Sequence, residues 1–299
     1  MAFKPGFDQS PAFNNAGRNA YNSGQNPYGQ NQYGAQYGGQ PYGQQAPYGQ
    51  QQPYGQQAPT PEQLAHMYDR PAAGPVETER MSYEDTIVKT TITFGVLVVG
   101  AVIGWNVPGL MLVGALVGFV LALVNTFKKK PSPALILLYA GMEGLFVGGI
   151  SAVFNQMWDG IVAQAVFGTL GVFAVTLVLF SFGKIRASAR ATKIFIVAMV
   201  GYLAFSLVNV VLQWTGVQDS AFGLRDVEVF GIPLGVLIGI FVVIMAAYSL
   251  VLDFDRIQTG VQRGAPRIYA WTAAFGLVVT LVWLYVEVLR LLAILRGND

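Results

Sequence analysis

The sequence predicts an all-α membrane protein with seven transmembrane helices, preceded by a disordered N-terminal tail. Of its 299 residues, 53% are hydrophobic and only 11% are charged, whereas soluble domains are about 25% charged. From Thr90 onward the chain divides into seven apolar segments, and each is long enough to cross the hydrocarbon core of a bilayer. Leu, Ile and Val are absent from residues 1–63, so this part lacks the apolar side chains that a folded core requires.

The tail is a low-complexity segment. Residues 1–60 are rich in Gln, Tyr, Gly and Pro, and units such as PYGQQ recur within them. We expect this segment to be disordered and cytoplasmic. It acts either as an inert tether or, through its tyrosines, in weak multivalent self-association or in docking of a protein partner. Residues 61–81 form a polar linker, and residues 82–299 form the transmembrane domain.

The domain begins with a helix-start pattern and continues through the seven apolar segments. Ser82 can cap the first free N–H groups, and the acids that follow suit the positive end of the helix dipole. The first two segments form a tight hairpin broken at Pro108. The predicted segments are residues 88–105, 108–127, 134–154, 161–182, 193–214, 230–252 and 269–295.

The loop charges predict the orientation in the membrane. Lysines and arginines concentrate in the tail and in the loops that follow the second, fourth and sixth segments, whereas Arg225 and Arg296 lie on the other side. Basic loops stay in the cytoplasm, so we expect a cytoplasmic N-terminus and an external C-terminus. Trp105, Trp158 and Trp214 then fall at the external edge, where an aromatic belt is expected.

Small residues recur four positions apart in the apolar segments. Such pairs allow close contact between helices inside a membrane. We expect these pairs to pack helices within the molecule, and the alternative is a glycine-lined pore. The pairs are Gly100/Gly104, Gly114/Gly118, Gly144/Gly148 and Gly235/Gly239.

Two acids mark the end of the sixth segment. Asp253 closes it and Asp255 follows two residues later. At a frayed helix end both carboxylates could turn toward one cation, and carboxylate oxygens are ligands that Ca²⁺ prefers. Asp253 is therefore a candidate metal ligand and pH sensor. The alternative is that Arg256, three residues on, neutralises Asp253.

Three further ionisable residues lie within the apolar segments, where ionised groups are costly and indicate function. Glu287 and Arg290 are three apart on one face of the last helix, so they can form a structural ion pair, or Arg290 can extend to the interface. Glu143 has no opposite charge nearby in its own segment. It must be neutral, face water or meet a cation from another helix.

The residue inventory argues against several other functions. The only histidine is His66 in the linker, so Ser151 has no histidine base within the apolar segments. The chain has no cysteine and no nucleotide-binding or metalloprotease motif. The net charge of +2 is too small to indicate nucleic acid. We therefore expect no enzyme, no cofactor and no cleaved signal peptide.

Four stretches carry a resemblance to a known family. The sequences LVLDFDRIQTG and LYVEVLRLLAIL near the C-terminus, with MSYEDTIVKT and YAGMEGLFVGGISAVF upstream, resemble the Bax-inhibitor family. This family of transmembrane Bax-inhibitor-motif proteins includes the bacterial YccA-like branch, and the upstream stretches look like its actinobacterial version. The resemblance covers residues 81–295 and leaves the tail outside.

The resemblance implies a fold and an activity. It implies seven helices with the last one central and surrounded by the other six, in the plasma membrane of a bacterium. Members of this kind are pH-sensitive calcium leak channels with an aspartate pair as proton sensor. Asp253 matches the first aspartate, whereas Thr280 stands where the second is expected. Val117 stands near the position where the family has a glutamate that partners the arginine matching Arg290, and Glu143 or Glu287 could replace the missing acids.

Two functions follow from the resemblance. The first is a calcium or cation leak pathway gated by protonation near Asp253, with Ca²⁺ as the permeant ion. The second is a non-conducting membrane regulator, such as a modulator of a membrane-bound AAA protease or of a stress or cell-envelope complex. In the second function the tail would bind the protein partner, and in both the lipid bilayer is the surrounding medium.

Overall fold

A computed structural model describes residues 79–217, 220 and 222–297. Within these ranges seven helices are long and apolar enough to cross a membrane, which confirms the predicted fold class. They are α3 (Tyr83–Asn106), α4 (Met111–Phe127), α5 (Pro133–Met157), α6 (Ile161–Ser181), α7 (Ala189–Trp214), α8 (Leu234–Gln262) and α9 (Ala270–Arg296). Short 3₁₀ turns are η2 (Pro108–Leu110), η3 (Gly223–Asp226) and η4 (Arg267–Tyr269). The predicted tail and most of the linker lie outside the described residues.

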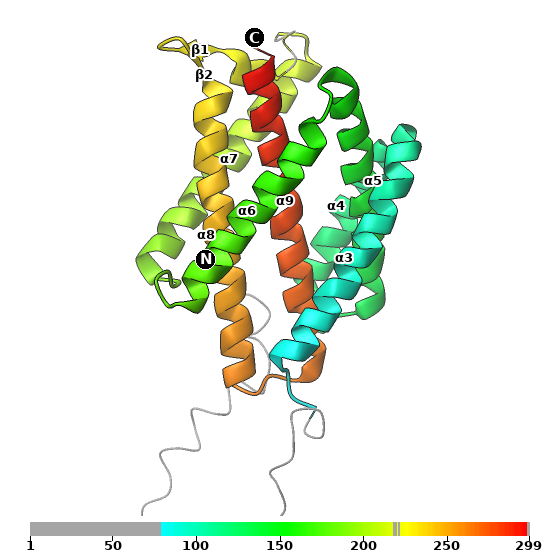
Figure 1. Cartoon of the computed structure of the whole chain (residues 1–299), viewed down its shortest axis with the longest axis vertical. Helices are drawn as coiled ribbons and strands as arrows, with labels where there is room; N and C mark the ends of the chain where they lie inside the picture. Colours follow the sequence, from blue (N-terminus) through cyan, green and yellow to red (C-terminus); the bar gives the residue numbers. More distant parts are fainter. Residues whose placement is uncertain (1–78, 218–219, 221, 298–299) are drawn as a thin grey trace, which may run out of the picture.

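The last helix lies in the middle of the bundle (Figure 1). α9 is the most buried of the seven helices and packs against α3, α5, α6 and α8, so the predicted central position is confirmed. The other six do not all surround it, however. α4 packs mainly on α5, and α7 is the least buried helix, at the periphery. We call the end of the bundle with the chain's C-terminus the C-terminal end, and the end with the α8–α9 connection the turn end.

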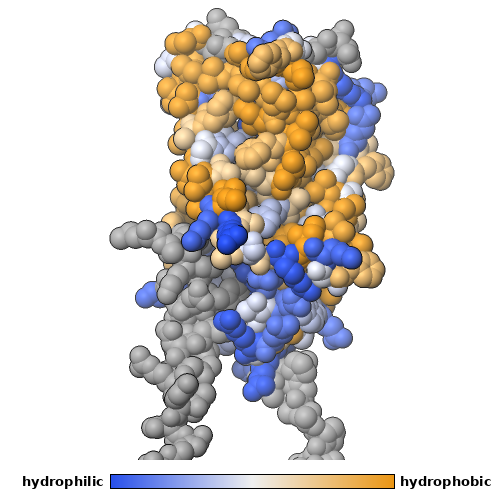
Figure 2. Space-filling model, turned by 90° about the vertical axis from the view of Figure 1, so that its left-hand side faces the viewer, coloured by the Kyte–Doolittle hydropathy of each residue, from blue (hydrophilic) through white to orange (hydrophobic). Residues whose placement is uncertain are grey.

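The outer surface of the bundle is apolar. Large hydrophobic side chains on α3, α4 and α7 are exposed, and Figure 2 shows an apolar band over one face with hydrophilic residues gathered mainly below it, toward the turn end. Exposed apolar surface of this extent requires a lipid environment. The arrangement is therefore that of a chain that crosses the membrane repeatedly.

The residues before α3 are fastened to the α8–α9 connection. Ser82 caps α3 by accepting a hydrogen bond from the Asp85 N–H (3.1 Å), as the sequence predicted. The backbone of residues 79–81 pairs with residues 265–267: the Met81 N–H donates to the Ala265 carbonyl (2.7 Å) and the Arg267 N–H donates to the Glu79 carbonyl. We call this pairing the tail clamp. The end of the predicted linker is thus part of the fold.

Glycines hold α3 and α5 at close contact. Gly100 lies against the backbone of Gly141 and Gly144, and Gly148 lies against the backbone of Ala101. A Cβ at either position would overlap backbone atoms of the facing helix. These glycines therefore pack helices within the molecule, which confirms the predicted role of the spaced pairs.

Replacing Gly148 by alanine should destabilise the domain. The added methyl group would meet the backbone of Ala101, which cannot move aside as a flexible side chain would, and overpacking of this kind costs about 1–3 kcal/mol. Thermal unfolding in detergent measures the effect. Gly171→Ala is the matched control, because nothing lies within 4 Å of a Cβ at that glycine. Equal unfolding temperatures for the two variants would contradict the packing role.

The sixth apolar helix begins later and ends later than predicted. Residues 230–233 belong instead to a hairpin, in which β1 (Glu228–Val229) is antiparallel to β2 (Ile232–Pro233). Phe230 and Gly231 have φ values of 55° and 77°, which turn the chain back before α8 begins. At its other end α8 continues to Gln262 because Phe254 and Ile257 are buried in the core. Asp253 consequently lies inside the helix.

Candidate functional site

One face of α9 carries two buried polar centres. Thr280 and Glu287 are seven residues apart and therefore lie on the same helix face, separated along the axis by about 10 Å. Both are buried. The Thr280 centre faces α8, and the Glu287 centre faces α7 and the turn η3. Two polar centres on the most buried helix of a membrane bundle are the strongest candidates for a functional site.

The first centre joins α8 to α9 through Asp253. The Asp253 side chain is buried, and its Oδ2 accepts a hydrogen bond of 2.7 Å from the Thr280 hydroxyl. The Ser249 hydroxyl lies 3.2 Å from the same threonine oxygen. Gly276 leaves room for the carboxylate, since a Cβ there would lie 3.2 Å from Asp253 Oδ1. Thr280 thus occupies the place opposite Asp253 that the family resemblance assigns to the second aspartate.

Arg256 is the only charged partner of Asp253 among the described residues. Its Nη1 lies 3.3 Å from Asp253 Oδ1, the contact that the alternative interpretation of the three-residue spacing requires. The arginine side chain is 46% exposed, whereas the aspartate side chain is 6% exposed. Water therefore screens the arginine, and the pair is weak for a buried carboxylate.

Asp255 does not lie beside Asp253, so the arrangement in which both acids could turn toward one cation is not formed. Because the helix is continuous at this point, the two side chains point to different faces. Asp255 is half-buried and makes no hydrogen bond or ion pair with any described residue. Across residues 79–297, leaving out 218, 219 and 221, no group of three or more His, Asp and Glu side chains could hold a metal ion. A resident calcium ion at Asp253 therefore gains no support.

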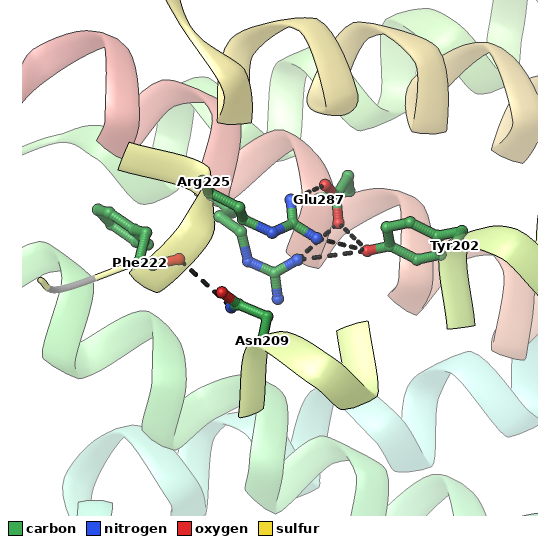
Figure 3. A network of polar contacts seen from close by, with 6 residues as sticks. Tyr202, Asn209, Phe222, Arg225 and Glu287 are labelled. Atoms are coloured by element: carbon green, nitrogen blue, oxygen red, sulfur yellow. Dashed lines mark hydrogen bonds and ion pairs between the residues drawn. The ribbon is translucent and has the colours of Figure 1, made fainter. Parts of the chain in front are cut away.

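The second centre surrounds Glu287 with three donors (Figure 3). The residue is only 1% exposed. Its Oε1 accepts from Arg225 Nη1 (2.8 Å), and its Oε2 accepts from Arg290 Nη1 (2.7 Å) and from the Tyr202 hydroxyl (2.9 Å). Arg225 also donates from Nη2 to the Tyr202 hydroxyl (2.9 Å). The predicted pair of Glu287 with Arg290 is therefore part of a larger network.

Arg225 is the functional candidate that the sequence did not reveal. It was expected in an external loop, yet it is 4% exposed and reaches into the bundle from η3. Asn209 of α7 holds this turn by accepting from the Leu224 N–H (2.7 Å) and donating to the Phe222 carbonyl (3.3 Å). The residues next to Arg225 in the sequence do not indicate that its side chain is buried. Only its pairing with an acid 62 residues later explains its place.

The neighbours of Arg225 keep it charged. Burial lowers the pKa of the guanidinium, but the Glu287 carboxylate and the Tyr202 hydroxyl raise it, so that the pKa lies above its ordinary value. Arg290 is also cationic, since an arginine is not deprotonated in proteins. The centre therefore holds two positive charges against one carboxylate.

Glu143 belongs to neither centre. Its carboxylate lies against Gly118 of α4, where a Cβ would be 2.9 Å from Oε2, and the residue is half-buried. Glu143 makes no hydrogen bond or ion pair with any residue in the described part of the chain. Val117, which stands near the position where the resemblance implies a glutamate, is exposed. The carboxylate that pairs with Arg290 is thus Glu287, and Glu143 remains apart.

The helices and the two buried centres define a multi-pass integral membrane protein with polar groups along its central helix. The chain belongs to the Bax inhibitor 1 like family, whose match extends over residues 5–297. This confirms the resemblance that the four sequence stretches carry, and the match also takes in the tail that these stretches left outside. No curated protein matched the sequence.

Proposed function

We propose that this protein is a gated leak pathway for cations, Ca²⁺ among them, in a bacterial plasma membrane. The observation that carries the proposal is the 2.7 Å hydrogen bond from Thr280 to the buried Asp253, which joins α8 to the central helix. It lies at the position that the resemblance assigns to a proton sensor. A buried carboxylate held by one neutral hydroxyl and a screened arginine can bind either a proton or a passing cation.

The Glu287 centre supports a closed state of the proposed cation pathway, at the other end of that pathway from Asp253. Glu287 follows Thr280 on one face of α9, and two arginines neutralise its carboxylate. A cation that moves along this face from Asp253 would meet a net positive charge there. We therefore propose that Arg225 and Arg290 form a barrier to cations. Their side chains must move away from Glu287 before ions pass.

The orientation is part of the proposal. The turn end carries most of the hydrophilic residues seen in Figure 2, and the basic loops of the sequence fall at that end. We place this end in the cytoplasm and the C-terminal end outside. Asp253 then responds to the cytoplasmic side and Glu287 to the external side. No catalytic role is proposed for any residue.

Replacing Asp253 by asparagine should lower calcium flux into liposomes by at least about tenfold, the factor that about 1.4 kcal/mol of lost cation binding represents. Asparagine can still accept the Thr280 hydrogen bond but carries no charge, so it imitates the protonated carboxyl group. A calcium-sensitive dye inside the liposomes measures the flux.

Asp255→Asn is the matched control, because that carboxylate is two residues away and makes no described ion pair. Glu143→Gln should also leave the flux unchanged, since Glu143 lies away from both centres. Equal flux through wild type and Asp253→Asn, or no wild-type flux above that of empty liposomes, would end the leak proposal.

The second candidate is a non-conducting regulator of a membrane-bound protease or of a cell-envelope complex. The tail clamp favours it, because it fastens residues 79–81, the end of the linker that follows the tail, to the α8–α9 connection. A protein bound to the tail could thereby act on the helix pair that carries Asp253. Thr280 also favours it, since a threonine cannot titrate as the expected second aspartate would. If the wild-type protein gave no flux in the liposome experiment, the result would favour the non-conducting regulator over the leak pathway.

A further inference from the structure

A cavity opens beside the Glu287 centre, near the C-terminal end of the bundle. Its volume is about 540 Å³, and it lies between α5, α7, α9 and the turn η3. Most of its wall is apolar or aromatic, whereas one side presents the two arginines and several polar groups of α7. The residues that matter here are Phe154, Trp158, Trp283, Ser206, Arg225 and Arg290.

Arg290 lines this cavity, and its guanidinium group is only partly hydrogen-bonded. Glu287 is already neutralised by Arg225, which is almost completely buried and uses both Nη atoms on Glu287 and Tyr202. Arg290 directs Nη1 to the same two partners, at 2.7 Å from Glu287 and 3.5 Å from Tyr202. Its Nε and Nη2 make no hydrogen bond with any described residue. The Arg290 side chain is 28% exposed, so these donors can reach a ligand.

Ser206 supplies a second donor in the same cavity. It lies one turn after Tyr202 on α7, and its hydroxyl oxygen is buried with no hydrogen-bond partner among the described residues. Buried hydroxyl groups in folded proteins are nearly always paired, so an unpaired one beside a cavity points to a ligand. Glu287 is the one acid that lines the cavity, and its charge is balanced by Arg225.

We infer that this cavity binds the anionic head group of an amphiphile, with Arg290 and Ser206 as donors to a carboxylate or phosphate oxygen. The guanidinium fork matches the geometry of both anions. Phe154, Trp158 and Trp283 provide apolar contact for the first part of an attached chain. The rest of the chain can continue into the surrounding lipid past α7, which is the least buried of the seven helices.

The net charge of the Glu287 centre and the size of the cavity together favour an amphiphile over a small solute as the ligand. The surplus positive charge of the centre attracts an anion, while a cavity of this size with aromatic walls would leave a small ion in poor contact. Fatty acids and anionic phospholipids share the required chemistry, and the experiment below separates them. The inference depends only on the cavity and its charges, so it holds whether or not ions cross the bundle.

Quenching of tryptophan fluorescence tests the inference with the full-length protein in phosphatidylcholine nanodiscs. The probes are a dibrominated fatty acid and a dibrominated phosphatidylglycerol, because bromine quenches a nearby indole and Trp158 and Trp283 line the cavity. We expect saturable quenching by at least one probe. Quenching by the fatty acid alone assigns a carboxylate, and quenching by the phospholipid alone assigns a phosphate. The neutral methyl ester of the fatty acid should not quench saturably.

Arg290→Gln should weaken binding of the effective probe by about tenfold, because a charge-assisted hydrogen bond is lost. Ser206→Ala should weaken it by a smaller factor. The fold should tolerate both, since Glu287 keeps Arg225 and Tyr202. Arg296→Gln is the matched control: Arg296 also lies near the end of α9, but it donates to the Asp159 carbonyl and does not line the cavity.

With the lipid probes, three outcomes would overturn the inference. They are unchanged affinity in both Arg290→Gln and Ser206→Ala, equal saturable quenching by the methyl ester, and saturable quenching that persists when Trp158 and Trp283 are both replaced by phenylalanine. A fourth outcome would also contradict the inference: stabilisation of the protein by inorganic phosphate with no quenching by either lipid. The ligand would then be a free anion and not an amphiphile.

Discussion

Replacing Glu287 by glutamine should cost the folded protein about 3–5 kcal/mol, the loss expected when one partner of a buried ion pair is removed. Glutamine can still accept hydrogen bonds, but Arg225 would remain almost fully buried without a counter-charge, and Arg290 would lose its only acid among the described residues. A denaturant titration in detergent, followed by tryptophan fluorescence, measures the loss.

The same substitution at Glu228 is the matched control, because Glu228 is exposed in the hairpin strand that follows η3. That variant should unfold like wild type. Replacing Arg225 and Glu287 together by leucine should recover part of the stability, since no unpaired charge of this pair then remains. A Glu287→Gln variant as stable as the Glu228→Gln control would show that the network contributes little to the fold.

Replacing Thr280 by aspartate should make calcium flux strongly dependent on pH. The new carboxylate would lie close to that of Asp253, because the threonine hydroxyl is 2.7 Å from Asp253 Oδ2. At acidic pH the two groups share a proton and hold α8 against α9. At alkaline pH both are ionised, and their repulsion, about 4 kcal/mol at 4 Å for an effective dielectric constant near 20, separates the helices.

Flux through Thr280→Asp should therefore rise from acidic to alkaline pH by at least about tenfold, a factor well within the free energy of that repulsion. Thr280→Asn is the matched control, since its amide has a similar shape but does not titrate across this range. If Thr280→Asp and Thr280→Asn had the same pH profile in the liposome assay, the contact between α8 and α9 at this point would not be the gate.

Much of the fold follows from local sequence. The seven apolar segments, the cap at Ser82 and the break at Pro108 were all predicted, because each depends on the chemistry of neighbouring residues. The i, i+3 pairs of Asp253 with Arg256 and of Glu287 with Arg290 were predictable for the same reason. The predicted start of α8 was four residues too early. Phe230 opens the apolar run that indicates a helix, but it has a positive φ and belongs to the turn of the hairpin.

The candidate site was predicted only in part. The family resemblance assigned Asp253 and Thr280 to one sensor, and their hydrogen bond shows that the two positions meet. Asp253 and Asp255 could have met only at a frayed helix end, and they lie apart because helix α8 continues through both residues. The sequence left open whether Glu143 or Glu287 replaces a missing acid, and only the packing shows that Glu287 pairs with Arg290 while Glu143 lies against α4.

The sequence by itself determined that this chain has seven segments long and apolar enough to cross a membrane and that a few ionisable residues lie within or beside them. Tertiary structure decided which of those residues meet. Arg225 shows the difference most clearly: along the chain it is one charged residue in a connecting loop, and in the bundle it neutralises Glu287 of the central helix. Hydropathy and helix period act between near neighbours, whereas a buried charge takes its partner from whichever helix or turn the packing brings alongside.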